Sequence, residues 1–132
     1  MIVLDTHILV WWVNDDVALS KAARQAIEHE LTTNGDILIS SISSWEIALL
    51  VKKDRLTLSI NIDDWFKLIE KIKTVRFIPV NNQLAIQSVN LPGKFHSDPA
   101  DRIITALARQ HAAVLITADR KINAYLHVTT IC

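Results

Sequence analysis

The sequence feature that most constrains the fold is an alternation of short apolar runs with longer segments of helical spacing. Five runs are expected to form strands: residues 1–4, 36–40, 76–80, 113–117 and 128–132. Six segments are expected to form helices: residues 6–13, 19–35, 43–53, 61–75, 82–90 and 99–113. This alternation predicts an α/β fold whose central sheet, of four to five strands, is mostly parallel and is flanked by helices on both faces. We expect residues 1–132 to form a single domain.

Composition excludes several kinds of site. The chain has only two glycines, Gly35 and Gly93, so it contains neither a P-loop nor a G-x-G-x-x-G turn for nucleotide phosphates. Its one cysteine is Cys132, which excludes a disulfide framework and a cysteine-based zinc site. The start of the chain lacks a signal-peptide pattern and no apolar run could span a bilayer, so we expect a cytoplasmic protein.

Isolated carboxylates stand at the places that this architecture brings together. Asp5 follows the first expected strand, and Asp119 follows the fourth. Glu46 lies near the start of the helix after the second strand, and Asp98 and Asp101 open the helix before the fourth. In a parallel sheet the carboxyl ends of strands and the amino ends of helices meet at one edge, where ligands bind. The sequence therefore predicts that the five acids converge.

Each acid alone also has a purely structural interpretation. Ser43-x-x-Glu46 matches a capping box, Asp98 suits the N-cap of its helix, and Asp119 suits a turn. Asp5 resists such an interpretation, because it lies between apolar segments and is expected to be partly buried. A buried charge must be paired, metal-bound or neutralised.

Several carboxylates at one edge repel one another, and a divalent cation removes that cost. Oxygen ligands favour magnesium, with manganese as the alternative, and such an ion promotes hydrolysis of a phosphodiester. Three hydroxyl side chains are expected to support the acids: Thr6, Ser43 and Thr117.

Net charge is zero, with 14 basic and 14 acidic residues, so RNA binding would need a local basic patch. The candidates for that patch are Arg102, Arg120 and Lys121, which could instead merely balance the acids.

The tryptophans are expected to lie in the core or at an interface and not to stack on bases. Trp11 and Trp12 are adjacent in the helical segment 6–13, which is apolar on all sides, so both cannot face the sheet. We expect at least one of them to contact a protein partner.

Four segments together resemble the PIN domain, and specifically the VapC family of toxin ribonucleases from type II toxin–antitoxin systems. They are "VLDTHILVWWV", "SSISSWEIALLVKKDRL", "LPGKFHSDPADRIITALARQ" and "LITADRKINAY", in the order found in that family. The resemblance implies a PIN-like fold and a magnesium-dependent endoribonuclease that cleaves transfer or ribosomal RNA. It implies catalytic roles for Asp5, Glu46, Asp101 and Asp119, and a metal site formed by Asp5, Asp101, Asp98 and Asp119.

The resemblance also implies partners: a VapB-like antitoxin, a second copy of the chain, and a heterotetramer or larger assembly. The sequence departs from the family at Asp54, where a glycine is often found, and at Ala100, where an aromatic is often found. A receiver domain is excluded, because no aspartate ends the third expected strand. A haloacid-dehalogenase-like phosphatase is excluded, because Asp5-Thr6-His7 lacks the second acid of its D-x-D motif. The remaining alternative is a catalytically inactive PIN-like module that binds RNA or protein.

Overall fold

The computed structural model of the protein describes residues 1–132 and consists of five strands and seven helices. The strands are β1 (Ile2–Leu4), β2 (Ile37–Ser40), β3 (Val75–Ile78), β4 (Val114–Ile116) and β5 (Thr130–Ile131). The helices are α1 (Thr6–Val13), α2 (Lys21–Thr33), α3 (Ser41–Lys52), α4 (Ile62–Glu70), α5 (Asn82–Val89), α6 (Pro99–Gln110) and α7 (Arg120–Asn123). None of the helices is long and apolar enough to cross a membrane.

The strands form one sheet in the order β3-β2-β1-β4-β5, and every neighbouring pair is parallel. This confirms the predicted fold class. The chain runs from β1 outward through β2 to β3, which is an edge strand followed by Pro79, and then returns to the other side of β1 for β4 and β5. The order of the strands therefore reverses between β1 and β4, and such a switch point opens a crevice at the carboxyl ends of the two strands.

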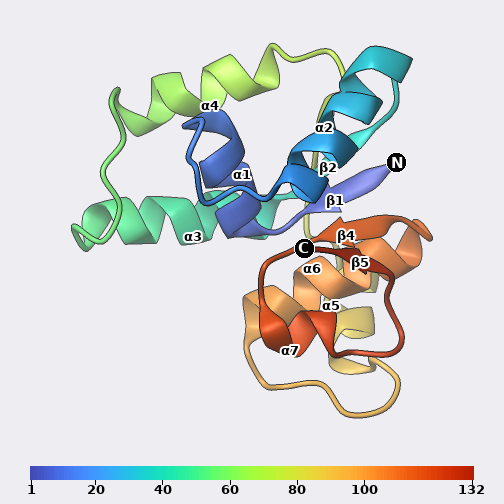
Figure 1. Cartoon of the computed structure of the whole chain (residues 1–132). Helices are drawn as coiled ribbons and strands as arrows, with labels where there is room; N and C mark the ends of the chain where they lie inside the picture. Colours follow the sequence, from blue (N-terminus) through green and yellow to red (C-terminus); the bar gives the residue numbers. More distant parts are fainter.

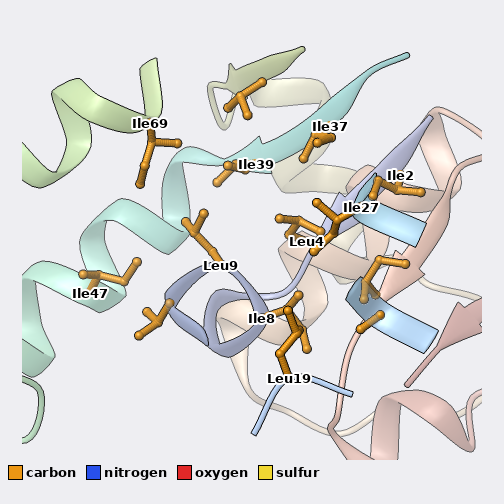
Figure 2. Packing of buried hydrophobic residues seen from close by; sticks show 14 of the residues in the cluster. Ile2, Leu4, Ile8, Leu9, Leu19, Ile27, Ile37, Ile39, Ile47 and Ile69 are labelled. Atoms are coloured by element: carbon orange, nitrogen blue, oxygen red, sulfur yellow. The ribbon is translucent and has the colours of Figure 1, made fainter. Parts of the chain in front are cut away.

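Side chains alternate across the sheet and build a core on each face. In β1, Ile2 and Leu4 belong to one buried cluster and Val3 belongs to the other. The first cluster lies under α1–α4 and the second under α5–α7, so helices cover both faces (Figure 1). Figure 2 shows the first cluster, in which Ile8 and Leu9 of α1 pack close to the strands. The two cores hold β1 and β4 rigidly, which fixes the edge where the predicted site lies.

The most informative differences from the predicted elements are at α3, α4 and α7. α3 begins at Ser41, because the Ser40 hydroxyl accepts the Ile42 N–H and caps the helix earlier than expected. α4 ends at Glu70, where a turn leads into β3. α7 was absent from the prediction, since its single turn is too short to show helical periodicity.

The turn after α3 accommodates the departure at Asp54. This residue adopts φ 57°, a left-handed conformation that glycine tolerates best. Aspartate is among the few other residues that adopt it readily, so the turn keeps the geometry that a glycine would give.

Candidate active site

One pocket at the carboxyl edge of the sheet gathers all five predicted acids. It has a volume of about 480 Å³ and lies at the switch point between β1 and β4. Its lining residues are Asp5, Thr6, His7, Trp11, Glu46, Asp98, Asp101, Ala118 and Asp119. The predicted convergence is thus confirmed in space. We call this cavity the acid pocket.

Asp5 is the most buried of these acids, with 6% of its surface exposed. It caps α1, where its Oδ1 accepts the Thr6 N–H at 2.8 Å. Its Oδ2 accepts the Thr117 hydroxyl at 2.7 Å. Burial raises the pKa of Asp5 above its ordinary value, although both hydrogen bonds oppose the rise. Asp5 is therefore held in the pocket by two hydrogen bonds in a place where burial disfavours its charged form.

Glu46 is not a capping residue. Because α3 begins at Ser41, Glu46 lies in its second turn and Ser43 is already helical, so the capping-box interpretation is wrong. The Thr6 hydroxyl donates to Glu46 Oε1 at 2.6 Å. Since that hydroxyl has one proton, its 2.8 Å contact with Ser43 makes the serine the donor. Burial, and then the charges of the neighbouring acids, raise the pKa of Glu46.

Asp98 and Asp101 divide two tasks at the start of α6. Asp98 is the N-cap, as predicted, and its Oδ1 accepts the Asp101 N–H at 2.9 Å. The Asp101 carboxylate faces the pocket, where its Oδ2 lies 2.6 Å from His96 Nε2. Burial raises the pKa of Asp101; the bond to His96 lowers it, and the charges of Asp98, Asp5 and Asp119 raise it further. The sequence does not predict the pairing of His96 with Asp101, although the two residues are only five positions apart.

The Thr117 side chain links the carboxyl ends of β1 and β4 through hydrogen bonds. Its hydroxyl donates to Asp5 and accepts the Asp119 N–H at 3.1 Å. Asp119 in turn caps α7, where its Oδ1 accepts the Ile122 N–H at 3.0 Å. Thr6 and Thr117 therefore donate hydrogen bonds to acids directly, whereas Ser43 is linked to Glu46 through the Thr6 hydroxyl.

The negative charge of the acid pocket has almost no counter-charge within the protein. No lysine or arginine forms an ion pair with any of the five acids, and His96 is the only side chain that pairs with one. An all-oxygen donor set with an uncompensated charge fits a hard divalent cation. No three acidic or histidine side chains are already gathered closely enough to enclose an ion, so the fit rests on donor chemistry and charge.

The raised carboxylate pKa values predict an unusual pH dependence of stability. Since Asp5, Glu46 and Asp101 have pKa values raised by folding, their contribution is most favourable at acidic pH and is lost as pH rises through those values. We therefore expect the metal-free protein, in EDTA, to melt at a higher temperature near pH 5 than near pH 7. Calorimetry across this range tests it. A Glu46→Gln/Asp101→Asn variant should flatten the profile, and an unchanged slope in that variant would contradict the assignment.

Arg102 has a different role from the predicted one. Its guanidinium donates hydrogen bonds of 2.9–3.1 Å to four backbone carbonyls, those of Ser88, Val89, Phe95 and His96. These bonds use four of its five N–H donors, so the side chain does not reach out to hold a phosphate. Arg102 instead ties the segment before α6 to that helix and thereby positions His96 beside Asp101.

The other two basic candidates remain available to RNA. Arg120 and Lys121 are exposed in α7, directly after Asp119. Lys121 and the exposed Lys94 line a shallow pocket of about 300 Å³ that also includes His96. A basic rim therefore adjoins the acid pocket on its His96 side, and Lys94 is a member that sequence reasoning missed.

The four tryptophans occupy three kinds of environment. Trp65 is buried, and Trp11 and Trp12 are half-buried and pack against the core that underlies α1–α4. Trp11 also lines the acid pocket, with its ring 6.0 Å from that of His7. Trp45 is outside both cores and has 60% of its surface exposed, so a core position is wrong for it.

Comparison with known proteins agrees with this arrangement. Residues 2–126 match the model of the PIN domain family. The chain is 37% identical over 127 residues to Ribonuclease VapC22 of Mycobacterium tuberculosis (strain ATCC 25618 / H37Rv), which covers 96% of this chain and 92% of that protein. In fold it resembles VapBC2 from Rickettsia felis bound to a promoter DNA fragment, with a TM-score of 0.72, 20% identity and coverage of 99% and 98% of the two chains. It also resembles a toxin–antitoxin complex from Klebsiella pneumoniae, with a TM-score of 0.66, 24% identity and coverage of 98% and 97%.

Proposed function

We propose the activity of this chain from the premise that it belongs to the PIN domain family and, within that family, to the VapC ribonucleases. The protein is the toxin of a type II toxin–antitoxin system and a magnesium-dependent endoribonuclease that cleaves transfer or ribosomal RNA in the cytoplasm. One observation carries the proposal: five carboxylates line a single pocket, and only one imidazole pairs with any of them. Such a charge favours a cation that can bind a phosphodiester.

Each acid then has a distinct task. Asp5, Asp98, Asp101 and Asp119 would hold the ion, which when bound lowers the pKa of water and stabilises charge on the phosphoryl group. Glu46 Oε2 has no partner in the protein, because the Thr6 hydroxyl is on Oε1, and it can accept the proton of the attacking water. The raised pKa of Glu46 makes it a stronger base for this step.

The basic rim and the partner surface complete the proposal. Arg120 and Lys121, together with Lys94, would bind phosphates on either side of the cleaved bond. A VapB-like antitoxin would cover α1 at Trp11 and Trp12, and since Trp11 lines the acid pocket, that partner would sit at its mouth. Two copies of the chain would pair, and with the antitoxin would form a heterotetramer or a larger assembly.

Metal removal tests the activity directly. Cleavage of total bacterial RNA should fall to background in EDTA and return when excess magnesium or manganese is added, because the acids alone repel a phosphate. Magnesium should also raise the melting temperature of the protein, and Glu46→Gln/Asp101→Asn should lose most of that shift. Cleavage that persists in EDTA would contradict the metal mechanism. RNA binding with no cleavage in any divalent ion would favour an inactive PIN-like module.

A further inference from the structure

An apolar slot adjoins the acid pocket and has no role in the chemistry described so far. It has a volume of about 430 Å³ and lies between α3 and α6. Its lining residues are Ile42, Trp45, Glu46, Asp98, Pro99 and Ala100. Glu46 and Asp98 also line the acid pocket, so the two cavities are adjacent and share these two residues. A group held in the slot would lie directly beside a phosphate held by the acids.

Trp45 forms the exposed wall of this slot without contributing to either core. α3 buries Ser43 and Ile47, whereas Trp45 points away from them and remains 60% exposed. Ile42, one turn earlier, packs against the second core and lies beside the indole along the slot. Folding gains little from a large aromatic left in water at this position. Its location beside the acids suggests a ligand.

We propose that the slot binds a nucleobase of the RNA next to the cleaved phosphate, with the base stacked on the Trp45 indole. The inference rests on the function proposed above. The indole of Trp45 and the side chains of Ile42, Pro99 and Ala100 give the slot an apolar lining, and every base has an aromatic face that can stack. The rim is formed by the carboxylates of Glu46 and Asp98, which repel a phosphate but accept hydrogen bonds from a base.

The shared lining of the two cavities favours a base over a protein segment. Glu46 and Asp98 line both the slot and the acid pocket, so a group in the slot touches residues that would face the cleaved phosphate. An apolar segment of a second copy or of the antitoxin would press hydrophobic groups against these two carboxylates, which is unfavourable because it offers them no hydrogen bonds. A nucleobase presents N–H groups at its edge as well as an aromatic face.

Binding measurements in an Asp101→Asn background, in which the RNA remains intact, test the proposal. The probe is a mixed-sequence single-stranded RNA of eight nucleotides and a series with one abasic position each. Trp45→Ala should weaken binding of the intact RNA by roughly 5- to 150-fold, the range for one stacked base, and Trp45→Phe should weaken it much less. Leu68→Ala is the matched control, because it removes an exposed apolar side chain from α4, away from the slot, and should change nothing.

The abasic series locates the base. In the protein that keeps Trp45, one abasic position should weaken RNA binding. The same abasic position should not weaken binding to the Trp45→Ala variant any further. If the proteins with and without Trp45→Ala bound every RNA with equal affinity, the slot proposal would be overturned, while the proposed nuclease function would be unaffected. The proposal would also be overturned if Trp45→Ala kept its RNA affinity but no longer formed a dimer by light scattering, or no longer bound the antitoxin. Either result would assign the slot to a protein partner. Absence of any RNA binding or metal-dependent cleavage by the wild-type protein would instead remove the proposed function itself.

Discussion

Replacing Asp101 by asparagine should reduce RNA cleavage by at least about a hundredfold and, in the same protein, raise the melting temperature. Asparagine keeps an oxygen that can accept the His96 N–H, so the local geometry survives. It removes one charge from a group of acids whose pKa values are raised by burial and by one another. Relief of about 1 kcal/mol would appear as a rise of roughly 2–4 °C in EDTA.

The combination of lost activity and gained stability is what separates a functional acid from a structural one. Asp63→Asn is the matched control, since Asp63 is an exposed acid in the first turn of α4 and should be neutral for cleavage. The two readouts are the cleavage rate in excess magnesium and calorimetry in EDTA. An Asp101→Asn protein that retains wild-type cleavage would remove Asp101 from the catalytic set.

Replacing Arg102 by methionine should have the largest effect on stability among the exposed or half-buried positions near the site. Four carbonyls would lose a charged donor at once, and we expect the free energy of unfolding to fall by about 2–4 kcal/mol. Arg102→Lys should restore little of it, because an ammonium cannot reproduce the fork of the guanidinium. Urea denaturation measures the change.

Arg120→Met provides the comparison, because Arg120 is exposed and makes no such bonds. It should leave stability unchanged but reduce the salt dependence of RNA binding. If Arg102 were a phosphate ligand, its methionine variant would behave in the same way as Arg120→Met. A stable Arg102→Met protein with a reduced salt slope would restore the original prediction.

The sequence was sufficient for the fold and for the membership of the acid pocket, because both follow from order along the chain. Apolar runs separated by helices dictate a parallel sheet, and a parallel sheet brings the acids to one edge. The position of Glu46 within its helix could not be predicted. Four serines between positions 40 and 44 are all possible N-caps of α3, and the one that caps the helix decides which turn Glu46 occupies.

The contacts of Arg102 and His96 could not be predicted from the sequence for a different reason. The partners of Arg102 are backbone carbonyls, which carry no sequence signal. Two lie at the end of α5 and two in the loop before α6, so the contact depends on how α5 and α6 pack together. The exposure of Trp45 could not be predicted either, because residue type alone does not separate it from Trp11, Trp12 and Trp65, which all pack on the first core. Position in the fold, and not residue type, distinguishes these cases.

The origin of the acids in separate parts of the chain has a consequence during protein synthesis. Asp5 leaves the ribosome long before its partner Thr117, which follows it by 112 residues, and before the neighbouring Asp119. β4 pairs directly with β1, so a nascent chain that stops before residue 114 lacks a central strand as well as these two side chains. An interrupted translation product of this kind therefore carries at most four of the five acids and no formed pocket, so we expect activity only after synthesis has passed Asp119.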